Sequence, residues 1–380
     1  MISEKTHRAT TIAVCIIIAW LGAWGPVTAQ AADRPIRVTF LTPSPTSTRP
    51  FWRDYVAFMK VAATSLGMDL TVVEATNRFE VVDNAAVAIS STQPPDYLVY
   101  IYHAETTLTI LQLTEKTGIK SLIVNTGVVP QEKATAGAPR EKYPLWIGHI
   151  TPDDFLASRQ LAQRLIDRAT QLGLYAQDNA LHMIGVGGDL LATASMYRED
   201  GLRSVLGDNP DVILERFVRA NWSREIARDK TLKLLTMYPD VSVCWAVHDN
   251  TARGVIEAIK ESGAVPGKDI LTGGIDWSRE GIEAVRRGDM EASIGGHFMG
   301  GGWALILIYD YAHGIDFAST GVVIKSQMRL IDQNSLQHYL PAIEARNWQQ
   351  IDFKRFSKSG NPDLIDYDFS PDAVVKALKR

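Results

Sequence analysis

The sequence has little cysteine and no long apolar run, and both shortages narrow the classes of protein that it can encode. It contains 2 cysteines in 380 residues. Cys15 lies in a short apolar stretch near the N-terminus, so Cys244 is the one cysteine of the remaining chain. We therefore expect no internal disulfide, and the stability of the fold must come from packed apolar cores.

Positive charge is not in excess either, because 39 lysines and arginines stand against 43 aspartates and glutamates, for a formal net charge of −4. Nucleic-acid-binding domains usually carry a basic surface, so no nucleic-acid partner is expected. The motifs G-x-S-x-G, H-E-x-x-H and the P-loop are missing from the sequence. We therefore expect a protein that is not an enzyme and that needs no cofactor or metal.

The first 31 residues have the features of an export signal. Lys5 and Arg8 form a positive start, residues 12–24 form a short apolar run, and Ala29-Gln30-Ala31 is a small-residue cleavage site. The run is too short to predict a membrane span with confidence, although an uncleaved signal could still act as an anchor. We expect a soluble protein that is exported and cleaved near Ala31.

Beyond the signal, short apolar runs alternate with segments of helical period, which is the pattern of parallel strands joined by crossover helices. In the first half, strands are expected at 36–41, 70–74, 97–102 and 121–125, with helices at 51–66, 79–90 and 108–117. In the second half, strands are expected at 181–186, 212–218, 241–247, 270–275 and 292–294, with helices at 154–170, 195–206, 223–237, 251–262 and 279–287. The predicted fold class is α/β, with two doubly wound parallel-sheet lobes.

The repetition of this alternation predicts two lobes that the chain joins by three crossing segments. The N-terminal lobe is expected at 32–150 plus 297–324, and the C-terminal lobe at 151–296 plus 325–340. Residues 341–380 are polar, dotted with aromatic residues and without the α/β pattern, so we expect a tail packed on the surface.

In open parallel sheets, ligands bind outside the carboxyl ends of the strands, so the residues after each predicted strand are the informative ones. Amides, carboxylates and aromatic rings are frequent at these positions. Phe51 and Trp52 stand where a polar loop becomes a helix, beside Arg49, and His103 and Asn125 follow two later strands. Flat rings with polar neighbours suit a cyclic sugar, which has apolar faces and polar edges.

The order of several segments resembles the type I periplasmic solute-binding proteins of the ribose and galactose kind. The segments are PFW after the first strand, TPDDFLASRQLAQ at the lobe junction, SMYREDGL, NWSREIARDKTLKLL and ILTGGIDWSREGIEAV. The resemblance runs from about residue 36 to about residue 340. It implies a monomer that captures a small sugar or sugar-like ligand by hinge closure and delivers it to an ABC transporter permease.

The resemblance also implies roles for individual residues. The family's stacking rings fall on Phe51, Trp52 and Trp222, and its polar contacts fall on Arg49, Asn125, His248 and Asp276. Two positions depart from the pattern. Met196 stands where ribose binders have a ligand arginine and Gly296 where they have a glutamine, so ribose itself is not expected.

The segments RPIRVTFLTP, PPDYLVYIYHAETT and EKYPLWIGHITPDD also resemble the periplasmic receptors of the autoinducer-2 kind. This second resemblance places a ligand arginine on Arg198, whereas the other ligand arginine of those receptors falls on Gly296. It implies an alternative function, a receptor that reports ligand occupancy to a membrane sensor kinase or cyclase. The tail after Pro341 is then a possible docking element.

Structural roles compete with the ligand roles at several of these positions. Phe51 could face the core, Trp222 could pack at a helix start that Ser223 caps, and Asp276 could cap the next helix. Arg198 could brace the loop at 187–195, and Asn125 could shape a turn. Four histidines follow strand ends, namely His103, His149, His248 and His297, but their spacing lacks the short intervals of a metal site. We expect individual hydrogen bonds to ligand, above all from His248.

Overall fold

In the computed structural model, which describes residues 34–343 and 347–379, the alternation of strands and helices builds two six-stranded sheets. The expected signal peptide lies outside the described residues. The first sheet has the spatial order β11-β5-β4-β3-β1-β2, and all its pairings are parallel. Its strands are β1 (Arg37–Thr42), β2 (Asp69–Glu74), β3 (Tyr97–Ile101), β4 (Lys120–Val124), β5 (Trp146–Pro152) and β11 (Val323–Ser326).

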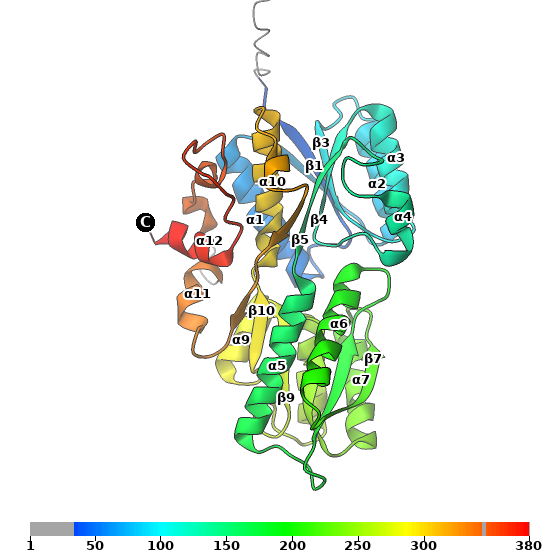
Figure 1. The fold of residues 1–380 in the computed structure, drawn as a ribbon, viewed down its shortest axis with the longest axis vertical. Coiled ribbons are helices and arrows are strands. Elements are labelled where there is room, and N and C mark those ends of the chain that lie inside the picture. Colours follow the sequence, from blue (N-terminus) through cyan, green and yellow to red (C-terminus); the bar gives the residue numbers. More distant parts are fainter. Residues whose placement is uncertain (1–33, 344–346, 380) are drawn as a thin grey trace, which may run out of the picture. The chain divides into compact units, whose positions relative to one another are not determined.

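The second sheet repeats this order as β12-β10-β9-β8-β6-β7. Its pairings are parallel except for β12, which runs antiparallel to β10. The strands are β6 (Leu181–Gly187), β7 (Val212–Arg219), β8 (Val241–Ala246), β9 (Leu271–Asp276), β10 (Ala292–Gly295) and β12 (Arg329–Ile331). The predicted class of two doubly wound parallel-sheet lobes is confirmed (Figure 1).

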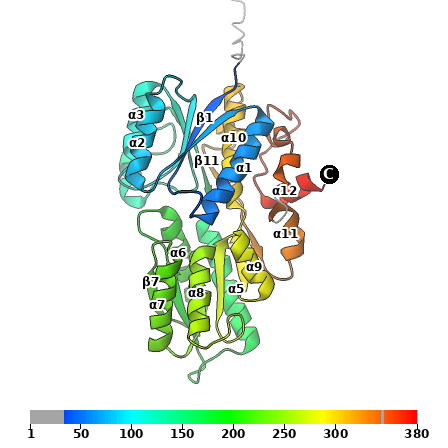
Figure 2. The ribbon, with the colours of Figure 1, turned by 180° about the vertical axis from the view of Figure 1, so that it is seen from behind.

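Helices cover the faces of both sheets (Figures 1 and 2). Those of the first lobe are α1 (Pro50–Leu66), α2 (Arg78–Ile89), α3 (Thr107–Thr117), α4 (Lys133–Ala136) and α10 (Gly300–Ala312). Those of the second lobe are α5 (Asp154–Leu172), α6 (Thr193–Asp208), α7 (Arg224–Met237), α8 (Asp249–Glu261) and α9 (Arg279–Arg287). The C-terminal part of the chain adds α11 (Leu336–Ile343) and α12 (Pro371–Leu378). Within the described part of the chain, no helix has both the length and the apolarity that a membrane crossing requires.

The chain passes between the two sheets three times. It crosses from β5 into α5, from β10 through the short helix His297–Met299 into α10, and from β11 into β12. Because every parallel strand ends toward the same edge of its own sheet, these crossings bring the ligand-side edges of the two sheets face to face. Most of the residues expected to bind ligand lie at or soon after strand ends on these edges, and Arg198 lies in α6.

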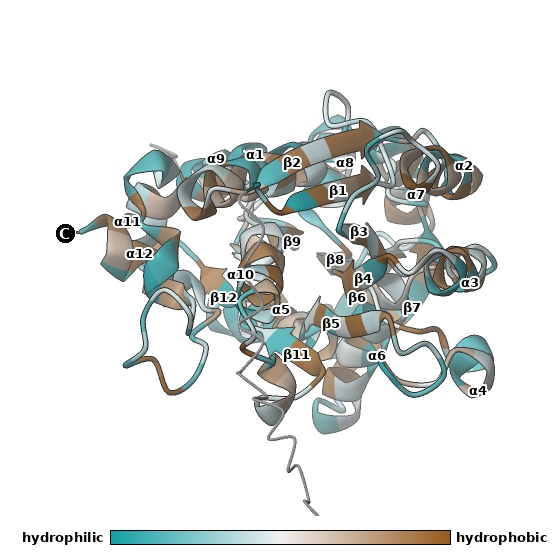
Figure 3. Cartoon of the chain, turned by 90° about the horizontal axis from the view of Figure 1, so that it is seen from above, coloured by the Kyte–Doolittle hydropathy of each residue, from teal (hydrophilic) through white to brown (hydrophobic). Residues whose placement is uncertain are grey.

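Helix α10 is important for the position of α1, whose first turn carries Phe51 and Trp52. Its residues are almost all buried, and Figure 3 shows their apolar character. At Gly301, an added Cβ would lie 2.8 Å from the ring of Tyr55, so the missing side chain allows α1 and α10 to pack closely. This packing fixes the start of α1 at the edge of the cleft.

Several parts of the fold differ from the prediction, including the edge strands β11 and β12, which were not expected. Strand β5 was treated as a junction, because Gly148 and His149 interrupt its apolar run, yet it pairs with β4 and β11. Helix α10 was not expected, since it begins with three glycines. Residues 341–380 were expected to pack on the surface, but Trp348, Phe353 and other side chains of this segment belong to the largest buried apolar cluster.

Candidate functional site

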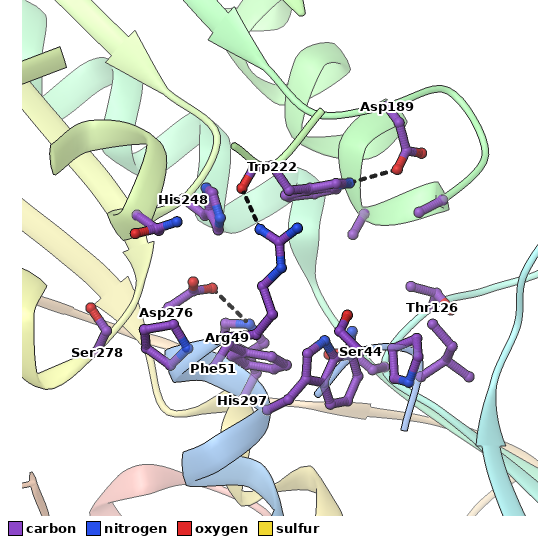
Figure 4. Close-up of a pocket in the computed structure, with 18 of the residues that line it drawn as sticks. Ser44, Arg49, Phe51, Thr126, Asp189, Trp222, His248, Asp276, Ser278 and His297 are labelled. Atoms are coloured by element: carbon purple, nitrogen blue, oxygen red, sulfur yellow. Dashed lines mark hydrogen bonds and ion pairs between the residues drawn. The ribbon is translucent and has the colours of Figure 1, made fainter. Parts of the chain in front are cut away.

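A cavity of about 210 Å³ lies between the strand ends of the two sheets. Figure 4 shows side chains from both lobes converging on it. All nine residues predicted to bind ligand line this cavity, namely Arg49, Phe51, Trp52, His103, Asn125, Arg198, Trp222, His248 and Asp276. These residues, which are spread over more than 200 positions of the sequence, therefore lie around one cavity.

Phe51 and Trp52 reach the cavity from the first turn of α1. Pro50 occupies the first helical position, where its missing N–H is not needed. Phe51 is half-buried and stacks on the imidazole of His297, with 4.7 Å between ring centroids. Trp52 is 9% exposed, and its ring also packs against that of Phe40 in β1, with 6.3 Å between ring centroids. Phe51 therefore offers more of its surface to the cavity, whereas Trp52 closes the wall and joins it to the core.

Trp222 faces these rings from the second lobe, in the turn before α7. Its backbone lies in the left-handed region, with φ of 63°, which is uncommon for a bulky residue. The indole Nε1 donates a hydrogen bond of 2.7 Å to Oδ2 of Asp189, and the ring meets His248 edge to face at 5.2 Å. Ser223 does cap α7, by accepting a bond from the N–H of Ile226, but Trp222 itself lines the cavity.

Asp189 was not among the predicted site residues. It follows β6 directly, and its Oδ1 accepts a hydrogen bond of 2.7 Å from the N–H of Leu191. Both of its oxygens are therefore occupied, one in shaping its own loop and the other in holding Trp222. Its position at a strand end was the available signal, but an aspartate in a glycine-rich loop is also typical of an ordinary turn.

The packing of Trp222 leads to a prediction about Gly188. A Cβ added at Gly188 would lie 2.6 Å from Cζ2 of Trp222, so Gly188→Ala must push the indole out of place. We expect this variant to weaken ligand binding about tenfold with little loss of thermal stability. Gly207→Ala in α6 is the matched control, because a Cβ there meets nothing within 4 Å. Equal affinities in the two variants, measured by titration calorimetry, would contradict the role given to Trp222.

Several hydrogen bonds and one ion pair connect the lobes across the cleft. The guanidinium of Arg49 donates a 2.9 Å bond to the backbone oxygen of Trp222 (Figure 4). The N–H of Gly127 donates a 2.6 Å bond to Oγ1 of Thr193, and Arg53 lies 3.6 Å from Glu280. Each of these contacts joins the first lobe to the second beside the cavity.

Asp276 ends β9 at the base of the cavity and is 6% exposed. Its Oδ1 lies 3.9 Å from Nη1 of Arg198 and 3.5 Å from Nε2 of His297. Ser278, not Asp276, caps α9. The alternative role of Asp276 as a helix cap is therefore wrong, and its carboxylate faces the cavity.

Arg198 has two roles in the structure. Its Nε donates a 2.8 Å bond to Asp154 at the start of α5, and its Nη1 donates a 2.9 Å bond to the backbone oxygen of Val247. It also lines the cavity beside Asp276. The brace expected for Arg198 therefore exists, but it is directed to α5 and β8 and not to the loop at 187–195.

The histidines of the cavity are neutral. Burial and the nearby guanidinium of Arg198 lower the pKa of both His248 and His297 to about 3, and burial lowers the pKa of His103. Nδ1 of His248 accepts a hydrogen bond from the N–H of Thr251, so the proton of this neutral ring sits on Nε2. His248 therefore presents an N–H donor to the cavity side of its ring.

Three polar atoms among the cavity residues are buried without a hydrogen-bond partner in the described part of the chain: Oδ1 of Asn125, Nδ1 of His103 and Nδ1 of His297. Buried polar atoms are normally satisfied, so these three atoms leave the cavity lining with unmet hydrogen-bonding capacity. Asn125 also has the left-handed backbone of a turn, with φ of 65°, so its turn role and its place in the cavity coexist.

His149 does not belong to this group. It lies inside β5, its Nε2 bonds to the backbone oxygen of Thr126 at 2.8 Å, and it lines a separate cavity of about 800 Å³ between the lobes. Of the four histidines near strand ends, His103, His248 and His297 line the first cavity and His149 does not. Over residues 34–343 and 347–379, no group of three or more histidines, cysteines or carboxylates is arranged to hold a metal ion.

The buried carboxyl of Asp276 predicts that stability depends on pH. Burial raises its pKa to about 7, although Arg198 acts in the opposite direction. A carboxyl with a raised pKa binds its proton more tightly in the folded state, so its contribution is complete below about pH 4 and is lost as the pH rises to about 7. We expect the melting temperature of the ligand-free protein to fall over this range, as followed by circular dichroism.

The comparison variant for this pH dependence is Asp276→Asn, which has the same shape and no proton to lose. Its melting temperature should fall less between about pH 5 and about pH 7 than that of the natural protein. Asp249 has a pKa raised in the same way by burial and by Asp276, so some slope remains in the variant. Parallel curves for the two proteins would show that Asp276 does not titrate in this range.

Two parallel-sheet lobes joined by three crossings, with a polar and aromatic cavity at the strand ends, define the class of two-lobed binding proteins. Residues 13–312 match the family described as "Periplasmic binding protein domain". The chain therefore belongs to the periplasmic binding protein family, and its fold is that of the type I members.

Curated relatives share part of the sequence. A stretch of 143 residues, 37% of this chain, is 29% identical to the xylitol-binding protein of Mycolicibacterium smegmatis and covers 38% of that protein. A stretch of 153 residues, 40% of this chain, is 24% identical to the galactofuranose-binding protein YtfQ of Escherichia coli and covers 46% of it. The matched regions span less than half the length of these two relatives.

A solved structure agrees over a longer range. A periplasmic sugar-binding protein from Pseudomonas fluorescens superposes with a TM-score of 0.80 and 29% sequence identity. The alignment covers 91% of this chain and 100% of that protein. The similarity therefore extends well past residue 312, where the family match ends.

Proposed function

We propose that this protein captures a small sugar or sugar-like molecule between its two lobes in the periplasm and delivers it, unchanged, to an ABC transporter permease. The observation that carries the proposal is the cavity itself, where Phe51 and Trp222 approach from opposite lobes and Asp276 lies at the base. Rings remove the apolar faces of a sugar from water, while a carboxylate and amides replace the lost hydration of its hydroxyls.

The size of the cavity supports a ligand of one sugar unit. At about 210 Å³ it lies below the usual range of about 300 to 1,000 Å³ for sites of drug-sized ligands, so a small ligand suits it better than an oligosaccharide. A single pentose, hexose or small polyol belongs to this class of ligand. The names of the curated relatives, which bind xylitol and galactofuranose, agree with this class.

The polar groups support a neutral, hydroxylated ligand. Asp276 and Oδ1 of Asn125 accept hydrogen bonds, whereas Arg49 and the Nε2–H of His248 donate them. A sugar hydroxyl can do both at once, so one ring with several hydroxyls satisfies all four groups. The contacts across the cleft form only when the lobes approach, and we propose that the three crossing segments act as the hinge.

A thermal-shift panel tests the ligand class. The mature protein is melted with xylitol, L-arabinose, D-galactose, D-ribose, D-allose and myo-inositol, and native mass spectrometry of freshly purified protein identifies any bound compound. A true ligand at a hundredfold its dissociation constant adds about 2.7 kcal/mol to the free energy of unfolding. Failure of every sugar and polyol to raise the melting temperature would refute the proposal, as would turnover of a bound sugar.

The membrane partner requires a separate experiment. The mature, ligand-loaded protein is used as bait for detergent-solubilised membranes, and the captured proteins are identified by mass spectrometry. We expect the permease of an ABC transporter and a monomeric bait. If a sensor kinase or cyclase is captured in place of a permease, the proposed delivery to a transporter is wrong. The proposed binding of the sugar ligand would still stand.

A further inference from the structure

The chain continues for 68 residues beyond the end of the family match, and this C-terminal part is attached to both lobes. We use the name C-terminal segment for residues 332–343 and 347–379, which follow β12. In Figures 1 and 2, α11 and α12 lie beside α1 and α10 of the first lobe and close to α9 and β10 of the second. The contacts to the two lobes are made by different residues.

The attachment to the first lobe is a buried carboxylate with aromatic packing around it. Asp310 of α10 is fully buried and accepts hydrogen bonds from Oγ of Ser357, the N–H groups of Lys358 and Ser359, and the hydroxyl of Tyr367, at 2.5 to 2.9 Å. Several rings of the segment also pack on those of α1 and α10: Trp348 and Phe353 on Phe58, and Phe356 and Phe369 on Trp303.

The attachment to the second lobe is made at the site. The ring of Tyr339 in α11 packs on the indole of Trp277, with 4.9 Å between centroids. The Tyr339 hydroxyl donates a 3.0 Å bond to Asp372 of α12, and Asp372 pairs with Arg329 of β12 at 2.7 Å. Trp277 is the residue directly after Asp276, so the segment touches the neighbour of the carboxylate at the base of the cavity.

The backbone at this point is strained. Asp276 has φ of 146° and Trp277 has φ of 59°, both in the region that side-chain-bearing residues seldom adopt. Such a conformation persists only where the surroundings hold it. Trp277 is fully buried and is held by two bonds to Ser293, from its N–H at 3.2 Å and from its Nε1 at 3.1 Å. The ring of Tyr339 packs on this indole.

The surroundings of Gly296 provide a second observation that the C-terminal segment packs against this part of the second lobe. Its φ is 97°, and a Cβ at this position would collide with Cγ of Pro371 in α12 while also approaching Trp277 to 3.5 Å. The C-terminal segment therefore occupies the space into which a side chain at position 296 would extend. A ligand-contacting residue cannot be placed there without moving α12.

We propose that Tyr339 is a positioning residue for the ligand site, because it holds Trp277 and thereby fixes the backbone that aims Asp276 into the cavity. The inference rests on the proposed function in that Asp276 contacts the ligand. It assigns to the C-terminal segment a supporting role in ligand recognition, in addition to its role in the core of the first lobe. It also explains why the segment reaches across to the second lobe.

The test compares two aromatic residues of the same segment. Tyr339 is 8% exposed and contacts Trp277, whereas Phe356 is 7% exposed and contacts Trp303 of the first lobe. Tyr339→Ala and Phe356→Ala should therefore lose stability to a similar extent. We expect only Tyr339→Ala to speed amide hydrogen exchange in the peptide 274–279, by about tenfold or more, as measured by mass spectrometry.

The same pair is titrated with xylitol, L-arabinose and D-galactose, using the compound that raises the melting temperature of the natural protein most. We expect Tyr339→Ala to raise the dissociation constant about tenfold and Phe356→Ala to leave it unchanged, because small displacements of a binding group cost affinity. Tyr339→Leu, which fills the space, is the replacement variant if the alanine variant does not fold. If Tyr339→Ala shows the same amide exchange in peptide 274–279 and the same dissociation constant as Phe356→Ala, the proposal is wrong.

The two proposals fail in distinguishable ways. If neither these three compounds nor the rest of the panel bind the natural protein, the proposed sugar ligand is wrong, while the exchange of peptide 274–279 still decides whether Tyr339 holds Trp277. If a compound binds and Tyr339→Ala binds it equally well, the positioning role is wrong and the proposed function stands.

Discussion

Trp222→Ala is expected to weaken ligand binding by about 30-fold to 1,000-fold, because it removes the stacking surface that the second lobe contributes to the cavity. Aromatic side chains at the centre of a binding site cost about 2 to 4 kcal/mol on truncation. Trp222 is only half-buried, and the chain around it is held by the Ser223 cap. The melting temperature of the ligand-free variant should therefore stay close to that of the natural protein. Titration calorimetry with the compound identified in the panel gives both affinities.

Trp222→Phe separates the ring from its hydrogen bond. Phenylalanine keeps a flat apolar face but cannot donate to Asp189, which the indole Nε1 contacts at 2.7 Å. An intermediate loss of affinity is expected, because the ring remains and its orientation is no longer fixed. If Trp222→Ala melts far below the natural protein, the residue belongs to the core and the assignment of the second stacking ring is wrong.

The alternation of apolar runs and helical segments was sufficient to predict the class of fold, because parallel strands buried on both faces are strongly marked in a sequence. The elements that escaped prediction are those whose formation depends on distant parts of the chain. Strand β5 contains Gly148 and His149, and it is a strand because β4 and β11 lie on either side of it. Helix α10 begins with Gly300-Gly301-Gly302, a poor helix start that is stabilised by close packing on α1.

Most of the predicted site residues line one cavity because the rule used to find them is topological, whereas Arg198 was named from the resemblance to the autoinducer-2 receptors. A residue directly after a parallel strand must lie at the ligand-side edge, whatever its neighbours are. The rule fails where the register or the end of a strand is misjudged, as for His149 in the unrecognised strand β5. It also cannot rank residues within one loop, so Asp189 was not singled out before its contact with Trp222 was known.

The C-terminal segment could not be placed from sequence because its rings have no regular spacing. Trp348, Phe353 and Phe369 are buried through contacts with Phe58 and Trp303, which lie far earlier in the chain. A periodic pattern of apolar residues predicts burial only where one regular helix or strand turns one face toward the core. The role of Asp310 in holding the segment could not be predicted from sequence either, because its four hydrogen-bond donors lie 47 to 57 positions later in the chain.

The aromatic rings and the carboxylate of the site differ in burial and backbone strain. Substitutions at the two kinds of residue therefore report on different properties of the protein. Phe51 and Trp222 are half-buried and replaceable, while Asp276 is buried, strained and close to Arg198 and His297. Truncation of a ring is therefore expected to report on affinity alone. A change at the carboxylate is expected to report on affinity and on pH dependence together.

Asp276→Asn is accordingly expected to have the second large effect, a loss of affinity by a factor of about 100 or more. A carboxylate that receives two ligand hydroxyls makes two charge-assisted hydrogen bonds, each of about 1.5 to 3 kcal/mol, and an amide can accept with only one of its atoms. Arg198 keeps its bond to Asp154 in the variant, so the arginine does not become an unpaired buried charge. The affinity is measured by calorimetry at about pH 8, where Asp276 of the natural protein is mostly ionised.

The matched control for this variant is Asp310→Asn, the same substitution at another fully buried aspartate. Asp310 holds the C-terminal segment through four donors and lies outside the cavity. It should lower the melting temperature and leave the affinity nearly unchanged, whereas Asp276→Asn should lower the affinity and retain most of the stability. If the two variants exchange these outcomes, the carboxylate at the end of β9 is a structural group and the ligand must be held by the rings and amides alone.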